Sequence, residues 1–142
     1  MSVTVDANVL VYASNTADPA FPPTRALLER LAGGPDLVYL FWPTIMGYLR
    51  IVTHPGILPR PLTFRDATTN ISMLLSRPHI RTHGENGGFW DLFLATSGQT
   101  RGNAVPDAHL VTLMRQFGVT TIYTRDRDFR RYAGITVRDP LA

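Results

Sequence analysis

Apolar and polar positions along the chain alternate between short runs with the period of a strand and longer stretches with the period of a helix. Runs rich in branched and aromatic residues predict strands at residues 3–5, 37–41, 79–82, 119–123 and 135–137. Helical periodicity, with start and stop signals, predicts a short helix at 9–13 and longer ones at 24–31, 43–52, 63 to near 78, 89–100 and 106–117. Such alternation is typical of an α/β fold with a mostly parallel sheet covered by helices.

Glycine and proline gather at residues 55–61 and 84–88, which predicts surface loops rather than linkers. With 142 residues and 44% hydrophobic content, the chain is large enough to fold around a core without disulfides or structural metal. We therefore expect a single domain over residues 1–142. No apolar run is long enough to span a bilayer and the N-terminus lacks a signal-peptide pattern, so a cytoplasmic location is the default expectation.

Composition excludes several kinds of chemistry. The chain has no cysteine, which rules out disulfides, thiolate metal sites and cysteine nucleophiles. All 14 of its Lys and Arg residues are Arg, which rules out Schiff bases and a phosphate-binding loop that ends in Gly-Lys-Ser/Thr. The net charge of +3 permits a nucleic-acid partner without requiring one, because codon bias in a GC-rich genome would also replace Lys by Arg.

Acidic residues stand at the boundaries of three predicted elements. Asp6 follows the first strand, Asp107 opens the helix at 106–117, and Asp126 follows the strand at 119–123. In a parallel sheet these boundaries fall at the same edge, so the three carboxylates are expected to converge. Carboxylates gathered in this way repel one another unless a cation offsets them, which predicts Mg²⁺ or Mn²⁺ and points to hydrolysis of phosphodiester bonds.

Each carboxylate also has a structural interpretation. Asp6 can cap the short helix that follows it, and Asp107 can favour the dipole of a first helical turn. Asp128 can cap the segment 129–132, and for this residue capping is favoured over metal binding. For Asp6, Asp107 and Asp126 taken together, a shared site is favoured.

Other polar residues lie near these boundaries. Arg50 comes one helical turn after Gly47, where it would contact a phosphate or pair with one of the carboxylates. Thr124 is a candidate for orienting Asp126 or a water through its hydroxyl group. The arginines around Asp126 would guide an RNA backbone by salt-sensitive phosphate contacts; they are Arg125, Arg127, Arg130 and Arg131.

Histidine and aromatic residues have mainly structural interpretations. His109 follows Asp107 by two positions, so on a helix it points away from that carboxylate and is rejected as the general base. His54 precedes a proline in an expected turn. A place in the core or a dimer interface is expected for Trp42, Phe89, Trp90 and Tyr123.

At these residues the chain resembles the PIN-domain ribonucleases, and specifically the VapC toxins of bacterial toxin-antitoxin pairs. The likeness rests on blocks that begin at residues 5, 47, 106 and 124: VDANVL, GYLRIVTHP, PDAHL and TRDRDF. Their order and spacing extend over almost the full length. The resemblance implies a PIN-like three-layer α/β/α sandwich with a short, mostly parallel sheet.

It also implies a Mg²⁺-dependent endoribonuclease, with Mn²⁺ as a substitute, that cleaves cellular RNA and so inhibits translation and growth. A homodimer and a VapB-like antitoxin, with a segment buried across the arginine-rich region, are implied as well. By the same resemblance, catalytic and metal-binding roles fall to Asp6, Asp107 and Asp126, a further metal-binding role to Asp128, and substrate contacts to Arg50, Thr124, Arg125 and Arg127.

One position departs from the family pattern. Many members carry a Glu where Gly47 stands, and glycine has no side chain to bind a metal. The departure favours one firmly held ion over two, with Asp128 or a substrate oxygen supplying part of what the Glu supplies elsewhere. It also leaves open an alternative function, in which a catalytically weakened PIN domain serves as a binding module for RNA or the antitoxin.

Two other classes with a parallel sheet fit less well. A receiver domain normally requires a Lys at the end of a late strand, and the chain has none. A phosphatase of the haloacid dehalogenase type requires a second Asp two residues after the nucleophile, where Asn8 stands.

Overall fold

The computed structural model describes residues 1–142. The strands form one five-stranded sheet in the order β3-β2-β1-β4-β5, and all neighbouring strands run parallel. The strands are β1 (Ser2–Val5), β2 (Leu37–Phe41), β3 (Ile80–His83), β4 (Thr121–Tyr123) and β5 (Thr136–Arg138). The helices are α1 (Ala7–Tyr12), α2 (Phe21–Ala32), α3 (Trp42–Thr53), α4 (Phe64–Leu75), α5 (Phe89–Ser97) and α6 (Val105–Gln116), with short 3₁₀ turns η1 (Gly102–Ala104) and η2 (Arg127–Arg131).

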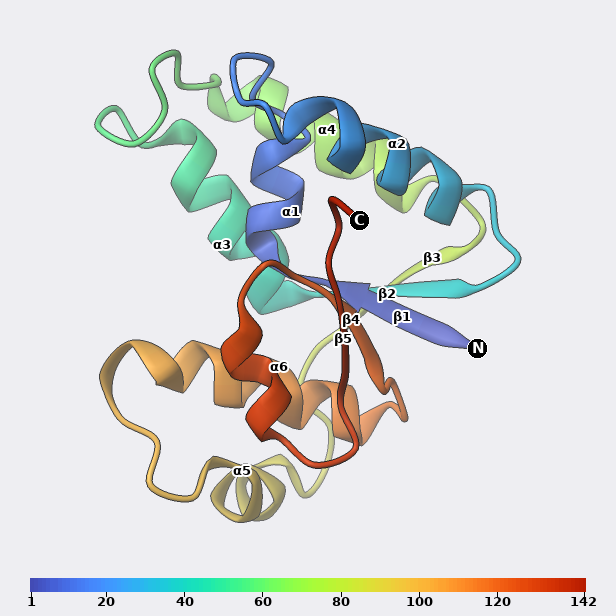
Figure 1. The fold of residues 1–142 in the computed structure, drawn as a ribbon, viewed down its shortest axis with the longest axis vertical. Coiled ribbons are helices and arrows are strands. Elements are labelled where there is room, and N and C mark those ends of the chain that lie inside the picture. The colour runs from blue at the N-terminus through green and yellow to red at the C-terminus, as the bar shows by residue number, and fades with distance from the viewer.

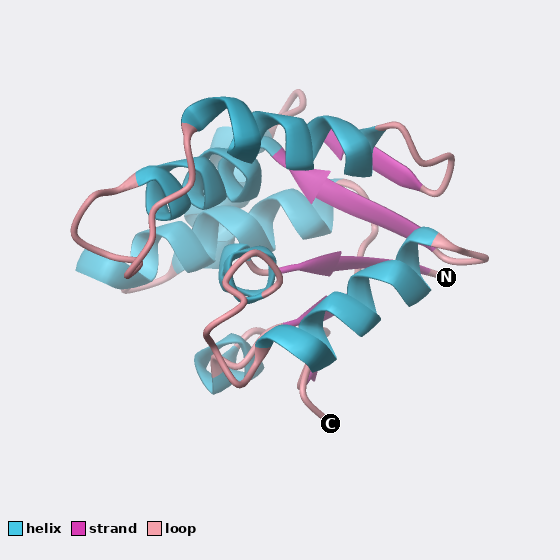
Figure 2. Ribbon diagram, turned by 90° about the horizontal axis from the view of Figure 1, so that it is seen from above, coloured by secondary structure: helices cyan, strands magenta, loops and turns pink.

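Helices cover both faces of the sheet, with α1 to α4 on one side and α5 and α6 on the other (Figure 1). Viewed from above, the layers are stacked along the line of sight, and the strands are seen in the gaps between the helices (Figure 2). Side chains alternate along each strand: Val38 and Leu40 of β2 join the core beneath α1 to α4, whereas Phe41 joins the core with α6. The predicted α/β fold with a parallel sheet is confirmed.

The element boundaries follow local chemistry. Thr63 caps α4 because its hydroxyl oxygen accepts a hydrogen bond from the backbone N–H of Asp66 (3.1 Å). Helix α2 begins three residues before the predicted start, since Pro22 fits the first turn, where its missing N–H has no helical partner to lose. Helix α5 ends before the predicted Thr100 because Gly98 adopts a positive φ of 54°. The predicted loops at 55–61 and 84–88 are confirmed.

Strand β1 is the point at which the chain changes direction across the sheet. From β1 the chain passes to β2 and β3 on one side, then returns through α5 and α6 to β4 on the other side. The carboxyl ends of β1 and β4 therefore lie side by side, and the backbone N–H of Asp6 donates a hydrogen bond to the carbonyl of Tyr123 (3.0 Å). Such a switch point is where open parallel sheets bind ligands.

None of the helices combines the length and the apolar character needed to cross a membrane.

Candidate active site at the switch point

Asp6 lies directly after β1, at the N-cap of α1, and its carboxylate is held from the neighbouring strand end. The hydroxyl of Thr124 donates a hydrogen bond to Oδ2 of Asp6 (2.9 Å), and the same hydroxyl oxygen accepts one from the backbone N–H of Asp126 (3.0 Å). Thr124 is 2% exposed, so its hydroxyl group is buried between the two acidic residues. The predicted link from Thr124 to this site is present, but it orients Asp6 through the side chain and Asp126 through the backbone.

Asp126 takes the capping role that the sequence suggests for Asp128. The carboxylate Oδ1 of Asp126 accepts a hydrogen bond from the backbone N–H of Asp128 (2.9 Å) and so caps η2. The prediction that Asp128 caps this segment was wrong, because η2 begins at Arg127 and the capping position falls one residue before it. Asp128 instead lies exposed in the first turn.

Asp107 lies in the first turn of α6 and is half-buried. Burial raises its pKa to about 6, and the negative charges of Asp126 and Asp6 add to the rise. The nearby Arg131 guanidinium opposes this effect. The structure thus brings Asp107 into the same electrostatic environment as the carboxylates at the strand ends, although it also occupies the first-turn position that the dipole interpretation requires.

Asp6 experiences the same surroundings. Burial raises its pKa, whereas the hydrogen bond from Thr124 and the backbone N–H groups of Ala7 and Asn8 lower it, and the charge of Asp126 raises it. The site therefore disfavours the ionised forms of both Asp6 and Asp107. A bound cation would stabilise those ionised forms.

The donor set fits a hard divalent cation with limited protein ligation. No three acidic or histidine side chains lie close enough together to surround one ion. Mg²⁺ is commonly held by one or two carboxylates and keeps several of its waters, so Asp6 and Asp107 suffice as protein ligands of that kind. A complete cage of three or four carboxylates is not formed by the side chains as they stand.

Gly47 of α3 lies beside α1 at the start of this site. A Cβ atom at this position would lie 3.6 Å from the Cβ of Ala7, an ordinary van der Waals contact. Space therefore exists for a Cβ atom where many members of the resembled family carry Glu.

The arginines around the site differ in their contacts. Arg50 is exposed and forms no ion pair, so the predicted alternative of an ion pair with an acidic residue of the site was wrong. The guanidinium of Arg125 lies over the ring of Tyr12, 5.6 Å from its centre, and Arg127 is exposed at the start of η2. In the sequence, Arg131 is one of several neighbouring arginines. Only the structure shows that its charge acts on Asp107.

The histidines and aromatic residues are placed largely as expected. Nε2 of His109 contacts Oε1 of Glu85 (2.5 Å), so its ring pairs with Glu85 rather than with Asp107. His54 accepts a hydrogen bond from the backbone N–H of Gly56 in a turn (2.9 Å). Of the four aromatic residues expected in the core or an interface, Tyr123 is buried and Phe89 packs against the core, whereas Trp42 and Trp90 are exposed.

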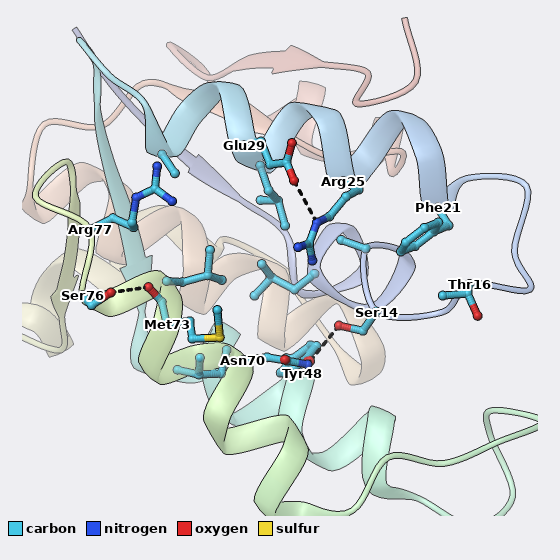
Figure 3. A pocket seen from close by; sticks show the side chains of 16 residues that line it. Ser14, Thr16, Phe21, Arg25, Glu29, Tyr48, Asn70, Met73, Ser76 and Arg77 are labelled. Carbon is cyan, nitrogen blue, oxygen red and sulfur yellow. Dashed lines mark hydrogen bonds and ion pairs between the residues drawn. The ribbon is translucent and has the colours of Figure 1, made fainter.

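A cavity of about 640 Å³ lies among the helices on the α1 to α4 face, and none of the three site carboxylates lines it. Figure 3 shows α2 and α4 on its two sides, with Arg25 paired to Glu29 on α2 and Arg77 beyond α4. At its base the hydroxyl of Tyr48 is 2.7 Å from that of Ser14 and accepts a hydrogen bond from the amide of Asn70 (3.2 Å). More than half of its lining residues are hydrophobic.

Comparison with curated proteins identifies the family. The chain is 50% identical over 144 residues to Ribonuclease VapC48 of Mycobacterium tuberculosis, an alignment that covers 100% of this chain and 99% of that protein. The chain belongs to the VapC family. Ribonuclease VapC37 of the same species is 32% identical over 140 residues, which covers 97% of this chain and 96% of that protein. No protein-family model matches the chain.

Solved structures of VapC proteins share the fold. VapBC2 from Rickettsia felis, bound to a DNA fragment from its promoter, superimposes with a TM-score of 0.68 at 16% identity and covers 98% of both chains. Mycobacterium tuberculosis VapC20, a Sarcin-Ricin loop cleaving toxin, has a TM-score of 0.67 at 17% identity and covers 94% of this chain and 98% of that chain. These likenesses confirm the predicted PIN-like α/β/α architecture.

Proposed function

We propose that this VapC-family protein is an endoribonuclease that acts as the toxin of a type II toxin-antitoxin system in the cytoplasm. One observation carries the proposal: Asp6, Asp107 and Asp126 come from three separate elements and share one electrostatic environment at the switch point. The 50% identity to a protein named a ribonuclease supports RNA as the substrate class. Cleavage of cellular RNA would inhibit translation and growth.

The proposed reaction depends on a divalent cation, Mg²⁺ with Mn²⁺ as a substitute. Asp6 and Asp107 would be its principal ligands, with Asp126 and Asp128 adding negative charge nearby. When bound, the cation supplies positive charge that favours ionisation of a water nucleophile and offsets charge on the phosphate oxygens.

The chain's own residues position these groups. Thr124 holds Oδ2 of Asp6, and the side chain of Asp126 is fixed through Oδ1, so each carboxylate keeps one oxygen outside these hydrogen bonds. Arg50, Arg125 and Arg127 are exposed and carry the charge that phosphates of a substrate would meet. The contact of Arg125 with Tyr12 restricts its guanidinium near α1.

The test is cleavage of total RNA by the purified protein with Mg²⁺, with Mn²⁺ or with EDTA. We expect discrete fragments only with metal, and a loss of about 100-fold or more in rate for Asp6→Asn and for Asp107→Asn. Asp66→Asn is the matched control, because Asp66 occupies the same place in the first turn of α4 that Asp107 occupies in α6. Undiminished cleavage by both site variants would refute the assignment.

A second candidate function is a weakened PIN domain that binds RNA or antitoxin without turnover. Gly47 favours it, because this position supplies no ligand and no three acidic side chains surround a common point. Metal binding by the wild-type protein without any Asp6-dependent cleavage would select this candidate over the toxin ribonuclease.

We propose a VapB-like antitoxin as the protein partner. The fold is shared with VapBC2 of Rickettsia felis, which supports pairing of this kind. We infer that an antitoxin segment covers Arg125 and Arg127, because a chain placed there would exclude RNA phosphates from the carboxylates. A pull-down tests this, with the purified protein as bait and the product of the neighbouring open reading frame as prey. Failure to recover that product would count against the proposal.

The 640 Å³ cavity between α2 and α4 supplies a control variant for the pull-down. Met73 lines it and is 65% exposed, so Met73→Glu changes the cavity without disturbing the core. Loss of capture in Arg125→Ala and Arg127→Ala, with Met73→Glu unaffected, supports the arginine surface. The reverse pattern would move the contact to the cavity between α2 and α4.

We also propose a homodimer. Exposed apolar side chains on α3 and α5 support it, since Trp42 is 43% and Trp90 64% exposed, with Met46 and Leu94 also exposed. Light scattering coupled to size-exclusion chromatography should give twice the chain mass for the wild type. A monomer at all accessible concentrations would contradict the proposal.

A further inference from the structure

A polar cleft of about 320 Å³ lies at the end of η2, the short element whose N-cap is Asp126. It is lined by Thr96, Ser97, Gln99, Thr100, Arg131 and Tyr132, which come from the end of α5, the loop after it and the end of η2. Only one of these residues is hydrophobic. Its volume lies at the lower end of the range of about 300–1,000 Å³ for small-ligand sites, so it suits a single nucleotide rather than a folded RNA element.

The floor of the cleft is held in place by Arg115 of α6. Its guanidinium donates hydrogen bonds to the hydroxyl of Thr96 (3.1 Å) and to the carbonyl of Ala133 (2.9 Å). On the rim, the hydroxyl of Thr100 donates to the carbonyl of Ser97. These bonds tie α5, α6 and the segment after η2 together, so the cleft exists before a ligand arrives.

Two side chains of the cleft keep free hydrogen-bonding groups. Gln99 is exposed and its amide has no hydrogen-bond partner in the protein. Arg131 donates from Nη2 to the hydroxyl of Tyr132 (3.0 Å), and its guanidinium lies 5.0 Å from the centre of the same ring. The remaining N–H groups of Arg131 have no partner within the chain.

Arg131 also connects the cleft to the proposed catalytic edge. Arg131 ends η2, the short element that Asp126 caps, and follows Asp128 by one 3₁₀ turn, so the cleft lies one turn from this acidic segment. The charge of Arg131 acts on both Asp107 and Asp128. A phosphate bound by Arg131 would place the neighbouring base or ribose at the cleft that Arg131 lines.

We propose that this cleft is the subsite for the nucleotide adjacent to the scissile phosphate, with Arg131 binding its phosphate and Gln99 hydrogen-bonding the edge of its base. Arg presents a planar fork of donors that matches a phosphate, and the Gln amide offers two donors and one acceptor to a base edge. Tyr132 is buried and its ring is covered by Arg131, so hydrogen bonding rather than stacking selects the base. The inference rests on the proposed ribonuclease function and names residues that set its specificity.

The first experiment maps the cut sites in a pool of single-stranded RNA 20-mers with a randomised central region. Wild type is expected to prefer one base at a position next to the cut. Gln99→Leu is expected to lower that preference, as the ratio of cleavage rates between the preferred base and the others, by about tenfold at that position alone. Arg131→Ala is expected to raise KM about tenfold with a smaller change in kcat, because it removes a phosphate contact made before and during reaction. Arg30→Ala is the control, since Arg30 is exposed on α2 and lines neither cleft.

The second experiment measures binding without cleavage. In an Asp6→Asn background, fluorescence anisotropy of the labelled RNA pool should show about tenfold weaker binding for Arg131→Ala and no change for Arg30→Ala. Thermal melting verifies that the variants fold, which their exposed positions favour.

The outcomes separate this inference from the proposed function. Asp6-dependent cleavage with unchanged base preference in Gln99→Leu and unchanged affinity in Arg131→Ala would overturn the subsite and leave the ribonuclease standing. RNA binding that depends on Arg131, with no cleavage by wild type, would retain the nucleotide site and overturn the ribonuclease.

Discussion

Thr124 joins two acidic residues through one buried hydroxyl group. It donates to the carboxylate of Asp6 and accepts from the backbone of Asp126, so it uses both hydrogen-bonding functions of a hydroxyl. Because it is almost completely buried, this side chain is better suited to positioning Asp6 than to contacting substrate directly.

Removal of this hydroxyl should therefore affect both stability and activity. Thr124→Val leaves the part-buried N–H of Asp126 without its acceptor, and we expect the free energy of unfolding to fall by about 1–3 kcal/mol. Cleavage should also weaken, and Thr124→Ser should restore both properties. Thr121→Val is the control in urea unfolding, because Thr121 is buried in β4, the strand that ends just before Thr124, and its hydroxyl forms no hydrogen bond. Equal losses for Thr121→Val and Thr124→Val would contradict the positioning role.

Asp107 makes stability depend on pH in the absence of metal. Its pKa rises from the ordinary value of 3.8 to about 6 in the folded protein, so the folded state binds more protons than the unfolded state between these values. Stability therefore falls as the pH rises through this window, and the penalty is complete above the folded pKa.

In EDTA, Asp107→Asn should consequently raise Tm at about pH 7 and lose this advantage at about pH 3, below the ordinary pKa of 3.8, where the carboxyl group is mostly protonated in both states. Asp66→Asn, at the equivalent helical position on an exposed turn, should show no such gain. Calorimetry over this pH range provides the measurement. A gain in Tm that is the same at both pH values would show that charge is not its cause.

Helices α1 and α3 approach each other closely where the site begins, and this contact involves two small residues. Ala7 of α1 and Gly47 of α3 face one another with space for a Cβ atom between the helices. The sequence shows that an acidic residue is missing from α3, but the available space is a property of the packing. The distance between two helices depends on side chains along their whole contact, which no local pattern specifies.

Substitution of Gly47 tests whether that missing residue limits metal affinity. Gly47→Glu places a carboxylate on the face of α3 beside Ala7, and we expect Mn²⁺ to bind at least about tenfold more tightly than to wild type. Gly47→Gln is the control, because it has the same shape without the charge. Isothermal titration of EDTA-stripped protein measures the affinity, and equal values for the two variants would exclude a ligand role at this position.

With the four histidines counted as neutral, positive charge resides only in arginine and the N-terminus. The net charge is +3, while the carboxylates at the switch point form a local negative region beside several arginines. RNA would thus be attracted by the arginines and require a cation at the carboxylates. The ion pairs of the chain involve only Arg25 among the arginines, so the others keep their charge available.

RNA affinity should accordingly decrease with salt. In the Asp6→Asn background, the slope of log affinity against log NaCl concentration should become shallower by about one for Arg125→Ala or Arg127→Ala. Arg30→Ala, remote on α2, should leave the slope unchanged. Filter binding at several NaCl concentrations measures this, and identical slopes in all variants would remove Arg125 and Arg127 from the RNA contact.

Hydrophobic periodicity by itself determined the order and type of the helices and strands, because each element must bury one face and its pattern records which face that is. The sequence also indicated Asp6, Asp107 and Asp126 as candidate site residues, because they stand at the boundaries of predicted elements and parallel strands place their carboxyl ends at one edge of the sheet.

Only the tertiary structure decided the strand order β3-β2-β1-β4-β5, which sets β1 beside β4 and so joins Asp6 to Thr124 across 118 positions of sequence. It also decided that Asp126 rather than Asp128 caps η2, and that Arg131, whose charge acts on Asp107, lines a polar cleft. These relations depend on distances between side chains from separate elements, and such distances arise from packing rather than from any local pattern.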